Sequence, residues 1–140
     1  MNKKTFYLLS FTWGLPMTII GCVVALALII CGYKPKKFGY CYYFTIGNNW
    51  GGLELGLFFL TDKSENIHTL KHEHGHALDN CLFGFFMPFI VCIPSAIRYW
   101  YREFRYHRKG IIPPTLYDDF WVENRATKRG YQFMKSVFGV

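Results

Sequence analysis

The sequence has few acidic residues and no paired cysteine motif. Asp and Glu together number 9 against 16 Lys and Arg, which gives a formal net charge of +7. The five cysteines are odd in number and form no C-x-x-C pair: Cys22, Cys31, Cys41, Cys81 and Cys92. Several lie in apolar runs, which indicates buried thiols that behave as small hydrophobes and favours a reducing compartment.

Nucleic-acid-binding motifs are also missing, so the basic charge points to a different partner. The lysines and arginines flank hydrophobic runs instead of lining one polar helix. Only 18% of the 140 residues are charged, whereas 51% are hydrophobic and 20% aromatic. These proportions are apolar for a domain of this length, so they favour contact with an anionic lipid bilayer and argue against nucleic acid.

Asp, Glu, Lys and Arg are absent from the whole stretch Phe6–Ile30. Its core, Met17–Ile30, is very apolar, and about 20 such residues cross a bilayer as a helix. A secretory signal peptide is the alternative, but the stretch is long for one and no A-x-A-like cleavage site follows. The sequence therefore predicts a retained transmembrane helix, with residues 1–33 as a membrane anchor and 34–140 as the remaining domain.

Two strand-forming segments follow the predicted anchor. Tyr40–Ile46 is rich in aromatic residues, Leu53–Leu60 is apolar, and the Gly- and Asn-rich stretch Gly47–Gly52 separates them. We expect these segments to form a β-hairpin with a loop between its strands. Gly52–Phe59 is then a candidate edge strand, on which an extended peptide pairs through its backbone. An ordinary packing hairpin is the alternative.

His72, Glu73 and His76 form an H-E-x-x-H sequence within a predicted helix. Residues four apart share one helix face, so the two imidazoles are placed to bind one zinc ion, with Glu73 beside the water on the metal. Zinc lowers the pKa of that water, and a carboxylate can take its proton as it attacks a carbonyl, most often that of a peptide bond. The nearby His74 also allows a non-catalytic metal site, and a solvated polar helix face is a further alternative. Gly75 either lets another segment approach closely or is tolerated in the helix.

A catalytic zinc site needs a third protein ligand besides the two histidines. Asp79 is too near on the same helix to reach the metal, and we expect Glu103, in a basic stretch, to pair with arginine. Glu123 has apolar neighbours on a helix predicted over Tyr117–Tyr131, where an inward-facing carboxylate needs a purpose. Glu123 is therefore the candidate third ligand.

With these residues the chain resembles the gluzincin type of zinc metallopeptidase. That family combines H-E-x-x-H with a ligand glutamate on a later helix, commonly as E-x-x-A-D. The match here is His72-Glu73-x-x-His76 followed by Glu123-x-x-Ala126. The resemblance implies that His72, His76 and Glu123 bind Zn²⁺, that Glu73 is the catalytic general base, and that the domain after the anchor is a zincin-like catalytic domain.

The resemblance covers residues 40–131, but one position departs from the family pattern. Where the family often has an aspartate that orients the first histidine, this chain has Thr127. Thr127 itself, Asp119 or Asn80 are the candidates for that orienting role. Four residues are candidate hydrogen-bond donors to the oxyanion of the transition state, and the sequence does not choose among them: Tyr117, Tyr131, His107 and Arg125.

The apolar segment 81–97 contains Pro88 and Pro94. If it crossed the whole bilayer, Glu123 would lie on the side opposite the two histidines. We therefore expect a Pro-broken, membrane-associated hairpin or a tilted segment within one leaflet. The lysines and arginines that follow the predicted anchor favour a cytoplasmic catalytic side, whereas Lys3 and Lys4 before the anchor favour the opposite orientation.

Together these features predict an α+β membrane protein with an N-terminal transmembrane helix, a small β-hairpin or sheet, the H-E-x-x-H helix, the Pro-broken segment and a C-terminal helix with the ligand glutamate. We expect it to hydrolyse peptide bonds in a peptide or membrane-protein substrate at a lipid bilayer, without nucleic acid. The compact layout of the motifs favours a bacterial inner membrane. The alternatives are a non-catalytic membrane protein with a structural metal site, or a role in binding a lipid surface.

Overall fold

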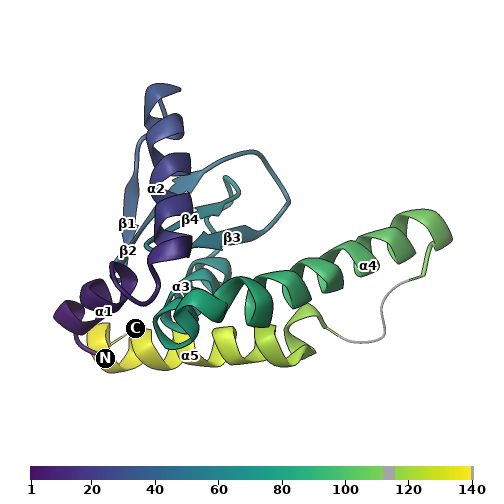
Figure 1. Cartoon of the computed structure of the whole chain (residues 1–140). Coiled ribbons are helices and arrows are strands. Elements are labelled where there is room, and N and C mark those ends of the chain that lie inside the picture. Colours follow the sequence, from purple (N-terminus) through teal and green to yellow (C-terminus); the bar gives the residue numbers. More distant parts are fainter. Residues whose placement is uncertain (112–115, 140) are drawn as a thin grey trace.

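Helices flank one small sheet in the computed structural model, which describes residues 1–111 and 116–139, apart from the side chain of Tyr117. Two helices come first and four strands follow: α1 (Lys3–Ser10), α2 (Leu15–Ile30), β1 (Lys36–Phe38), β2 (Cys41–Thr45), β3 (Gly52–Leu55) and β4 (Phe58–Thr61). The second half is helical: α3 (Ile67–Phe83), a 3₁₀ turn η1 (Gly84–Phe86), a π-helical turn η2 (Pro88–Cys92), α4 (Ile93–Lys109), a 3₁₀ turn η3 (Tyr117–Asp119) and α5 (Trp121–Phe138). In Figure 1, α4 extends away from the rest of the fold, and α5 runs back beneath α3.

The sheet has the strand order β1-β2-β4-β3, so β3 lies at one edge. β2 and β4 run parallel, and the other neighbouring pairs are antiparallel. The predicted hairpin between Tyr40–Ile46 and Leu53–Leu60 is therefore wrong, because the second segment contains two strands. The chain reverses at Gly56, which has a φ of +72°. A side chain there would also collide with Thr18 of α2, so both the conformation and the space require glycine.

The core lies between the sheet and the helices α3 and α5. Phe59 of β4, Leu70 of α3 and Phe133 of α5 are buried in one cluster, and Phe6 of α1 joins them. A second cluster connects α2, β3, η2 and α5 through the buried side chains of Met17, Leu55, Met87, Val91 and Val122. Burial of such apolar side chains is the main favourable contribution to folding, so these contacts hold α3 and α5 against the sheet.

The structure corrects the expected fold class of a membrane protein with an N-terminal transmembrane helix. Among the described residues, no single helix combines the length and the apolar composition that a membrane span needs. The charge-free stretch Phe6–Ile30 is divided between α1 and α2, which meet at 88°. Judged by length and composition alone, the two helices of this bent pair are together long and apolar enough to span a membrane. The same is true of the pair Ile67–Phe86 and Pro88–Lys109, which is bent by 116°. The observed fold is α+β with one four-stranded sheet.

The segment 81–97 contains the end of α3, the turns η1 and η2, and the start of α4. Gly84 has a φ of +55°, which ends α3. Pro88 is the first residue of η2 and follows the bend after η1, so its missing N–H costs no hydrogen bond there. Pro94 is the second residue of α4, but it lies within helical backbone that continues from Pro88 to Lys109, directly after the π-helical turn.

Candidate metal centre

Helix α3 carries the H-E-x-x-H residues on its buried side. Its start is fixed by Asn66, whose side chain accepts a hydrogen bond from the backbone N–H of His68 at 2.8 Å. His72, Glu73 and His76 are all buried. Because His72 and His76 are four residues apart, both imidazoles point to the same side of the helix, where α5 crosses beneath it.

The backbones of α3 and α5 are in near contact. A Cβ atom on Gly75 would lie 1.9 Å from the carbonyl oxygen of Ala126, and one on Gly130 would lie 1.8 Å from the carbonyl oxygen of Lys71. Backbone atoms cause both overlaps, so no side-chain rotation relieves them. The segment that Gly75 lets approach is therefore α5, and this approach brings Glu123 to the two histidines.

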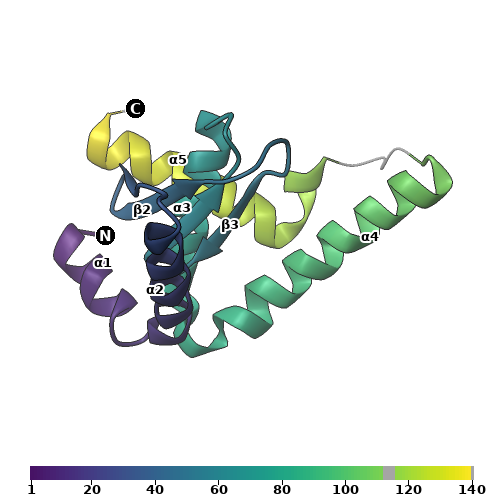
Figure 2. The same ribbon diagram turned by 90° about the horizontal axis from the view of Figure 1, so that it is seen from above.

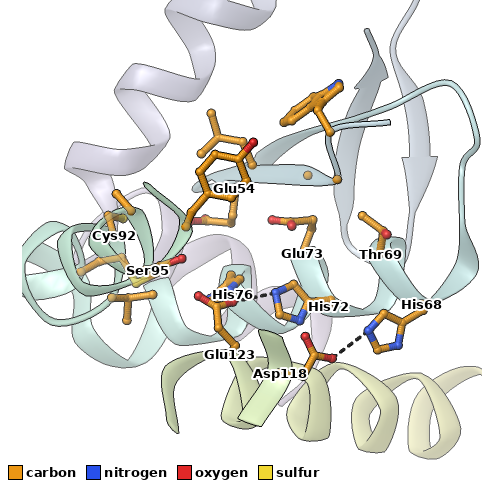
Figure 3. A pocket seen from close by; sticks show the side chains of 18 of the residues that line it. Glu54, His68, Thr69, His72, Glu73, His76, Cys92, Ser95, Asp118 and Glu123 are labelled. Carbon is orange, nitrogen blue, oxygen red and sulfur yellow. Dashed lines mark hydrogen bonds and ion pairs between the residues drawn. The ribbon is translucent and has the colours of Figure 1, made fainter. Parts of the chain in front are cut away.

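Three side chains from these two helices converge on one point (Figure 3). The Nε2 atoms of His72 and His76 lie 3.0 and 3.2 Å from Oε2 of Glu123. The potential ligand atoms of all three residues lie within 4.8 Å of one another. A tetrahedral zinc ion with bonds of about 2.1 Å holds its ligands roughly 3.4 Å apart. The structure thus brings the three predicted ligands together at a spacing that fits a small divalent cation.

A chain of hydrogen bonds determines which nitrogen of His72 carries the proton. The hydroxyl of Thr127 donates to Oδ2 of Asp118 at 3.0 Å, so its single proton is already used. The Thr127 oxygen lies 2.7 Å from Nδ1 of His72 and must therefore accept a proton from Nδ1–H. This leaves the lone pair of Nε2 directed at Glu123, as a metal-binding imidazole requires.

Asp118 is a residue that the sequence analysis missed. Its Oδ2 also accepts a hydrogen bond from Nε2 of His68 at 2.8 Å, and Nδ1 of His68 lies 3.1 Å from the hydroxyl of Tyr131. The only signal in the sequence was an acidic residue in the first turn of the helix predicted over Tyr117–Tyr131, which the helix dipole alone explains. Of the three candidates for orienting His72, the structure places Thr127 in contact with it, and Asp118 stands behind Thr127.

The electrostatics of the triad favour a positive charge between His72 and Glu123. Burial works to lower the pKa of His72, but the hydrogen bond with Glu123 and the charge of Glu73 outweigh burial and raise this pKa. Burial works to raise the pKa of Glu123, yet its hydrogen bonds with His72 and His76 hold this pKa well below the ordinary value. A lone pair of Nε2 facing a carboxylate oxygen needs a cation between them, and a metal ion fills that need as well as a proton does.

Glu73 lies beside the triad and faces the sheet (Figure 3). A Cβ atom on Gly52 of β3 would lie 2.5 Å from Oε1 of Glu73, so the edge strand and this carboxyl group are in close contact. Burial raises the pKa of Glu73 above its ordinary value, and the adjacent His72 and His76 oppose that rise. A carboxyl group whose pKa is shifted towards neutrality is suited to general acid–base chemistry.

A cavity of about 630 Å³ opens beside these residues. Strand β3 forms one wall, which includes Gly52 and Glu54, and α3 contributes the metal-site residues. The turn η2 and helix α4 form the facing wall, which includes Val91, Ser95 and Tyr99. Ser95 hydrogen-bonds to Glu123, a contact that no pattern in the sequence indicates. The cavity is therefore bordered by a sheet edge, the triad and a mostly apolar wall.

Two other buried polar residues of α3, Asp79 and Asn80, lie outside the triad. Asp79 forms ion pairs with Arg125 at 3.0 Å and Arg129 at 2.6 Å, both on α5, and its Oδ2 lies 4.0 Å from Nδ1 of His76. Asn80 donates a hydrogen bond to the carbonyl oxygen of Gly14 at 3.2 Å. Asn80 therefore anchors the connection between α1 and α2, and it does not orient His72.

The structure places the remaining candidates elsewhere. Asp119 accepts a hydrogen bond from the backbone N–H of Leu116 at 2.9 Å. Glu103 pairs with His107 at 2.9 Å, and not with an arginine as expected. Tyr131, His107 and Arg125 do not line the cavity as far as the described residues define it. The Tyr117 side chain lies outside the described residues.

His74, the third histidine of the cluster, belongs to the core. Its Nε2 accepts a hydrogen bond from the backbone N–H of Tyr40 at 3.2 Å, and its ring stacks on Phe133 with centroids 4.6 Å apart. Burial lowers the pKa of His74 to about 4, so the imidazole is neutral there at physiological pH. His74 does not join His72 and His76 at the triad.

Comparisons with known proteins leave the chemistry of the site to be inferred from its geometry. No family model, curated protein or solved structure matches the chain. The triad, the neighbouring carboxyl group and the cavity are therefore the features that indicate a function.

Proposed function

We propose that this chain is a zinc-dependent peptidase of the gluzincin type. The convergence of His72, His76 and Glu123 from α3 and α5 carries this proposal, because their ligand atoms share one point and the tautomer of His72 suits metal binding. Glu73 lies next to that point at the wall of a cavity large enough for part of a peptide. Two nitrogen ligands and one carboxylate, with space left for water, form a typical catalytic zinc set.

Each residue then has a defined role. His72, His76 and Glu123 would hold the zinc ion, which when bound lowers the pKa of a water molecule and polarises a carbonyl group. Glu73 accepts a proton from the attacking water and passes it to the departing amine, which requires a carboxyl group of moderately raised pKa. Ser95 and Thr127 hold Glu123 and His72 in their ligating orientations.

The edge strand offers a place for an extended peptide. The backbone N–H of Asp62 donates to the carbonyl oxygen of Gly51 at 3.0 Å, which makes these two residues a hydrogen-bonded pair of the β3–β4 ladder. Hydrogen-bonded and non-bonded pairs alternate in antiparallel strands, so the backbone groups of Gly52 and Glu54 point away from β4. Only the β3 part of the expected edge Gly52–Phe59 lies at the sheet edge. A substrate chain adding to β3 would pass directly over Glu73.

Metal content and hydrolysis, measured on the same samples, test this function. We expect about one zinc per purified chain and cleavage of a mixed library of unstructured peptides. Glu73→Gln should keep the zinc and lose at least about a thousandfold of the hydrolysis, because the base is removed and the ligands remain. His72→Ala should lose both. Glu103→Gln, at an exposed ion pair on α4, is the matched control and should change neither.

Two results would contradict the proposal. Hydrolysis that survives in Glu73→Gln would assign the activity to a contaminant or to another site. Stoichiometric zinc with no cleavage of any library peptide by the unmutated chain would leave a structural metal site in place of an enzyme.

A further inference from the structure

The outer side of α2 carries no polar residue. Every residue from Ile19 to Ile30 is apolar, glycine or cysteine, and the exposed ones include Val23 at 64%, Leu26 at 60% and Ile30 at 77%. The inner side is packed: a Cβ atom on Gly21 would lie 2.1 Å from the carbonyl oxygen of Leu55. A helix in contact with water normally has a polar face, so the outer side of α2 requires an apolar partner.

The same apolar surface continues across the ends of α1 and α3. Trp13, between α1 and α2, packs against Phe85 and Phe86 of η1, with ring centroids 5.5 and 6.1 Å apart. Phe11, Phe85 and Phe86 are more than half exposed, and Phe89 of η2 is 67% exposed. In Figure 2, α1, α2 and the turn from α3 into α4 lie along the same side of the molecule.

Helix α4 extends this surface with a single apolar stripe. Ile93, Ile97, Trp100 and Phe104 are spaced four, three and four residues apart, so they share one helix face, and all four are exposed. No residue of α4 is buried. We call the outer side of α2, the Phe11–Trp13 connection, η1, η2 and this stripe the apolar face.

Basic residues are placed at the margins of the apolar face. Lys3 and Lys4 begin α1, and three lysines follow the end of α2: Lys34, Lys36 and Lys37. All five are exposed. Arg108 and Lys109 end α4, and the whole chain has a net charge of +7. An apolar surface with tryptophans and a basic margin matches a bilayer whose headgroups are anionic.

We infer that the apolar face docks flat on an anionic lipid bilayer. The packing of α2 selects this geometry, because Met17, Thr18, Gly21 and Ala25 are buried against the protein and only the outer side is free for lipid. The chain therefore meets the bilayer as a surface-bound protein, with α2 parallel to the membrane plane and its outer side among the acyl chains. This inference does not depend on the metal centre.

Vesicle flotation tests the docking. The full chain is mixed with vesicles of phosphatidylcholine alone, or of phosphatidylcholine and phosphatidylglycerol at three to one. We expect it to float with the anionic vesicles and to bind them less well at high salt. Leu26→Glu and Phe89→Glu should each weaken binding by about tenfold or more, because each places a charge among acyl chains. Leu116→Glu is the control, since Leu116 is 74% exposed but lies outside the apolar face.

Several outcomes would overturn the inference. Absence of flotation, or equal weakening by Leu116→Glu, would remove the apolar face as a lipid site. A dimer in light scattering that Leu26→Glu dissociates, in a chain that does not float, would instead identify a second copy as the partner. Circular dichroism shows whether each variant is folded, and these exposed positions are chosen so that the fold tolerates the change.

Depth measurements separate a flat α2 from one that crosses the bilayer. Val23 and Ile30 are seven residues apart on the same outer side of α2. Fluorescent labels are attached after Val23→Cys or Ile30→Cys, in a chain with Cys22→Ser, Cys31→Ser and Cys92→Ala. Equal quenching depths are expected for a flat helix. Depths that differ by about 10 Å, the rise over seven residues, would overturn the docking geometry.

Discussion

Thr127 connects the first histidine of the triad to the carboxylate of Asp118. Its hydroxyl donates a hydrogen bond to Asp118 at 3.0 Å and accepts one from Nδ1–H of His72 at 2.7 Å, so it links the carboxylate to the imidazole. We expect Thr127→Val, which is nearly isosteric, to weaken zinc binding by about 10- to 100-fold, because Nδ1–H loses its acceptor. Competition with a coloured chelator measures this affinity.

Thr127→Ser is the matched variant, because it keeps the hydroxyl group and removes only a methyl group. It should stay within about threefold of the unmutated affinity. Equal zinc affinity in the valine and serine variants would show that the Thr127–Asp118 connection has no effect on the metal ligand.

Gly52 is a second position at which one added carbon atom should change the activity, because it lies against Glu73. A methyl group there would lie 2.5 Å from Oε1 and 2.7 Å from Cγ of Glu73. Gly52→Ala should therefore turn the carboxyl group away and reduce hydrolysis by at least about tenfold. Since Gly52 touches Glu73 and not the ligands, the zinc content should remain unchanged. A rate equal to that of the unmutated chain would show that Glu73 does not act from the observed position.

At the scale of elements, the contact between α3 and α5 brings the three proposed ligands together. Gly75→Ala places a methyl group where the carbonyl oxygen of Ala126 now lies, so the two helices must separate. We expect a loss of roughly 1–3 kcal/mol in the free energy of unfolding, from overpacking, together with weaker zinc binding. Chemical denaturation and chelator competition measure the two effects.

Lys128→Ala is the control for this prediction, at an exposed position of α5, the helix that Gly75 contacts. Lys128 is exposed on α5, so its replacement should leave both quantities within about 0.5 kcal/mol of the unmutated values. If Gly75→Ala behaved like Lys128→Ala, the close approach of the helices would not be what delivers Glu123.

The convergence of His72 and His76 could be predicted from the sequence, because residues four apart share one helix face. Glu123 was predicted because a carboxylate among apolar residues is buried only when it has a partner, such as a metal ion. Asp118 and Ser95 were not found, because their contacts depend on how η3 and α4 meet the triad. For Gly75 the sequence left close approach and simple tolerance open, and the packed helices favour close approach and identify the neighbour as α5.

The pairing of the strands could not be predicted from the sequence either. Aromatic and apolar composition located the strand-forming segments, but it gave no information about partners. Gly56 was not recognised as a turn, so β3 and β4 were taken as one strand and the parallel β2–β4 pair was missed. Pairing between strands distant in sequence depends on tertiary contacts, here with α2, and local preference does not encode it.

At the scale of the whole molecule, composition was misleading about the N-terminal stretch. Hydropathy averages over Phe6–Ile30 and ignores the connection between α1 and α2, where Gly14 precedes α2 and Pro16 occupies its first turn. That connection bends the chain by 88° and allows Phe6 to enter the core. The apolar content was correctly noticed, but its consequence is an uncovered helix side instead of a single long span.

The metal centre should also link the halves of the fold energetically. The proposed ligands come from α3 and from α5, so a zinc ion would bind them together only in the folded chain, where His72, His76 and Glu123 lie close in space. Zinc at 100 times its dissociation constant then stabilises the folded state by about 2.7 kcal/mol. For a chain of this size, the melting temperature should rise by on the order of 10 °C.

Scanning calorimetry of the chelator-treated chain, before and after zinc addition, measures this shift. Magnesium should produce little change, because it prefers oxygen ligands in octahedral geometry and two of the three donors here are imidazoles. His76→Ala should abolish the zinc shift, whereas Glu73→Gln, which leaves the ligands in place, should retain it. A melting temperature that zinc does not move would mean that α3 and α5 do not share a metal ion, and the assignment of Glu123 as a ligand would fall with it.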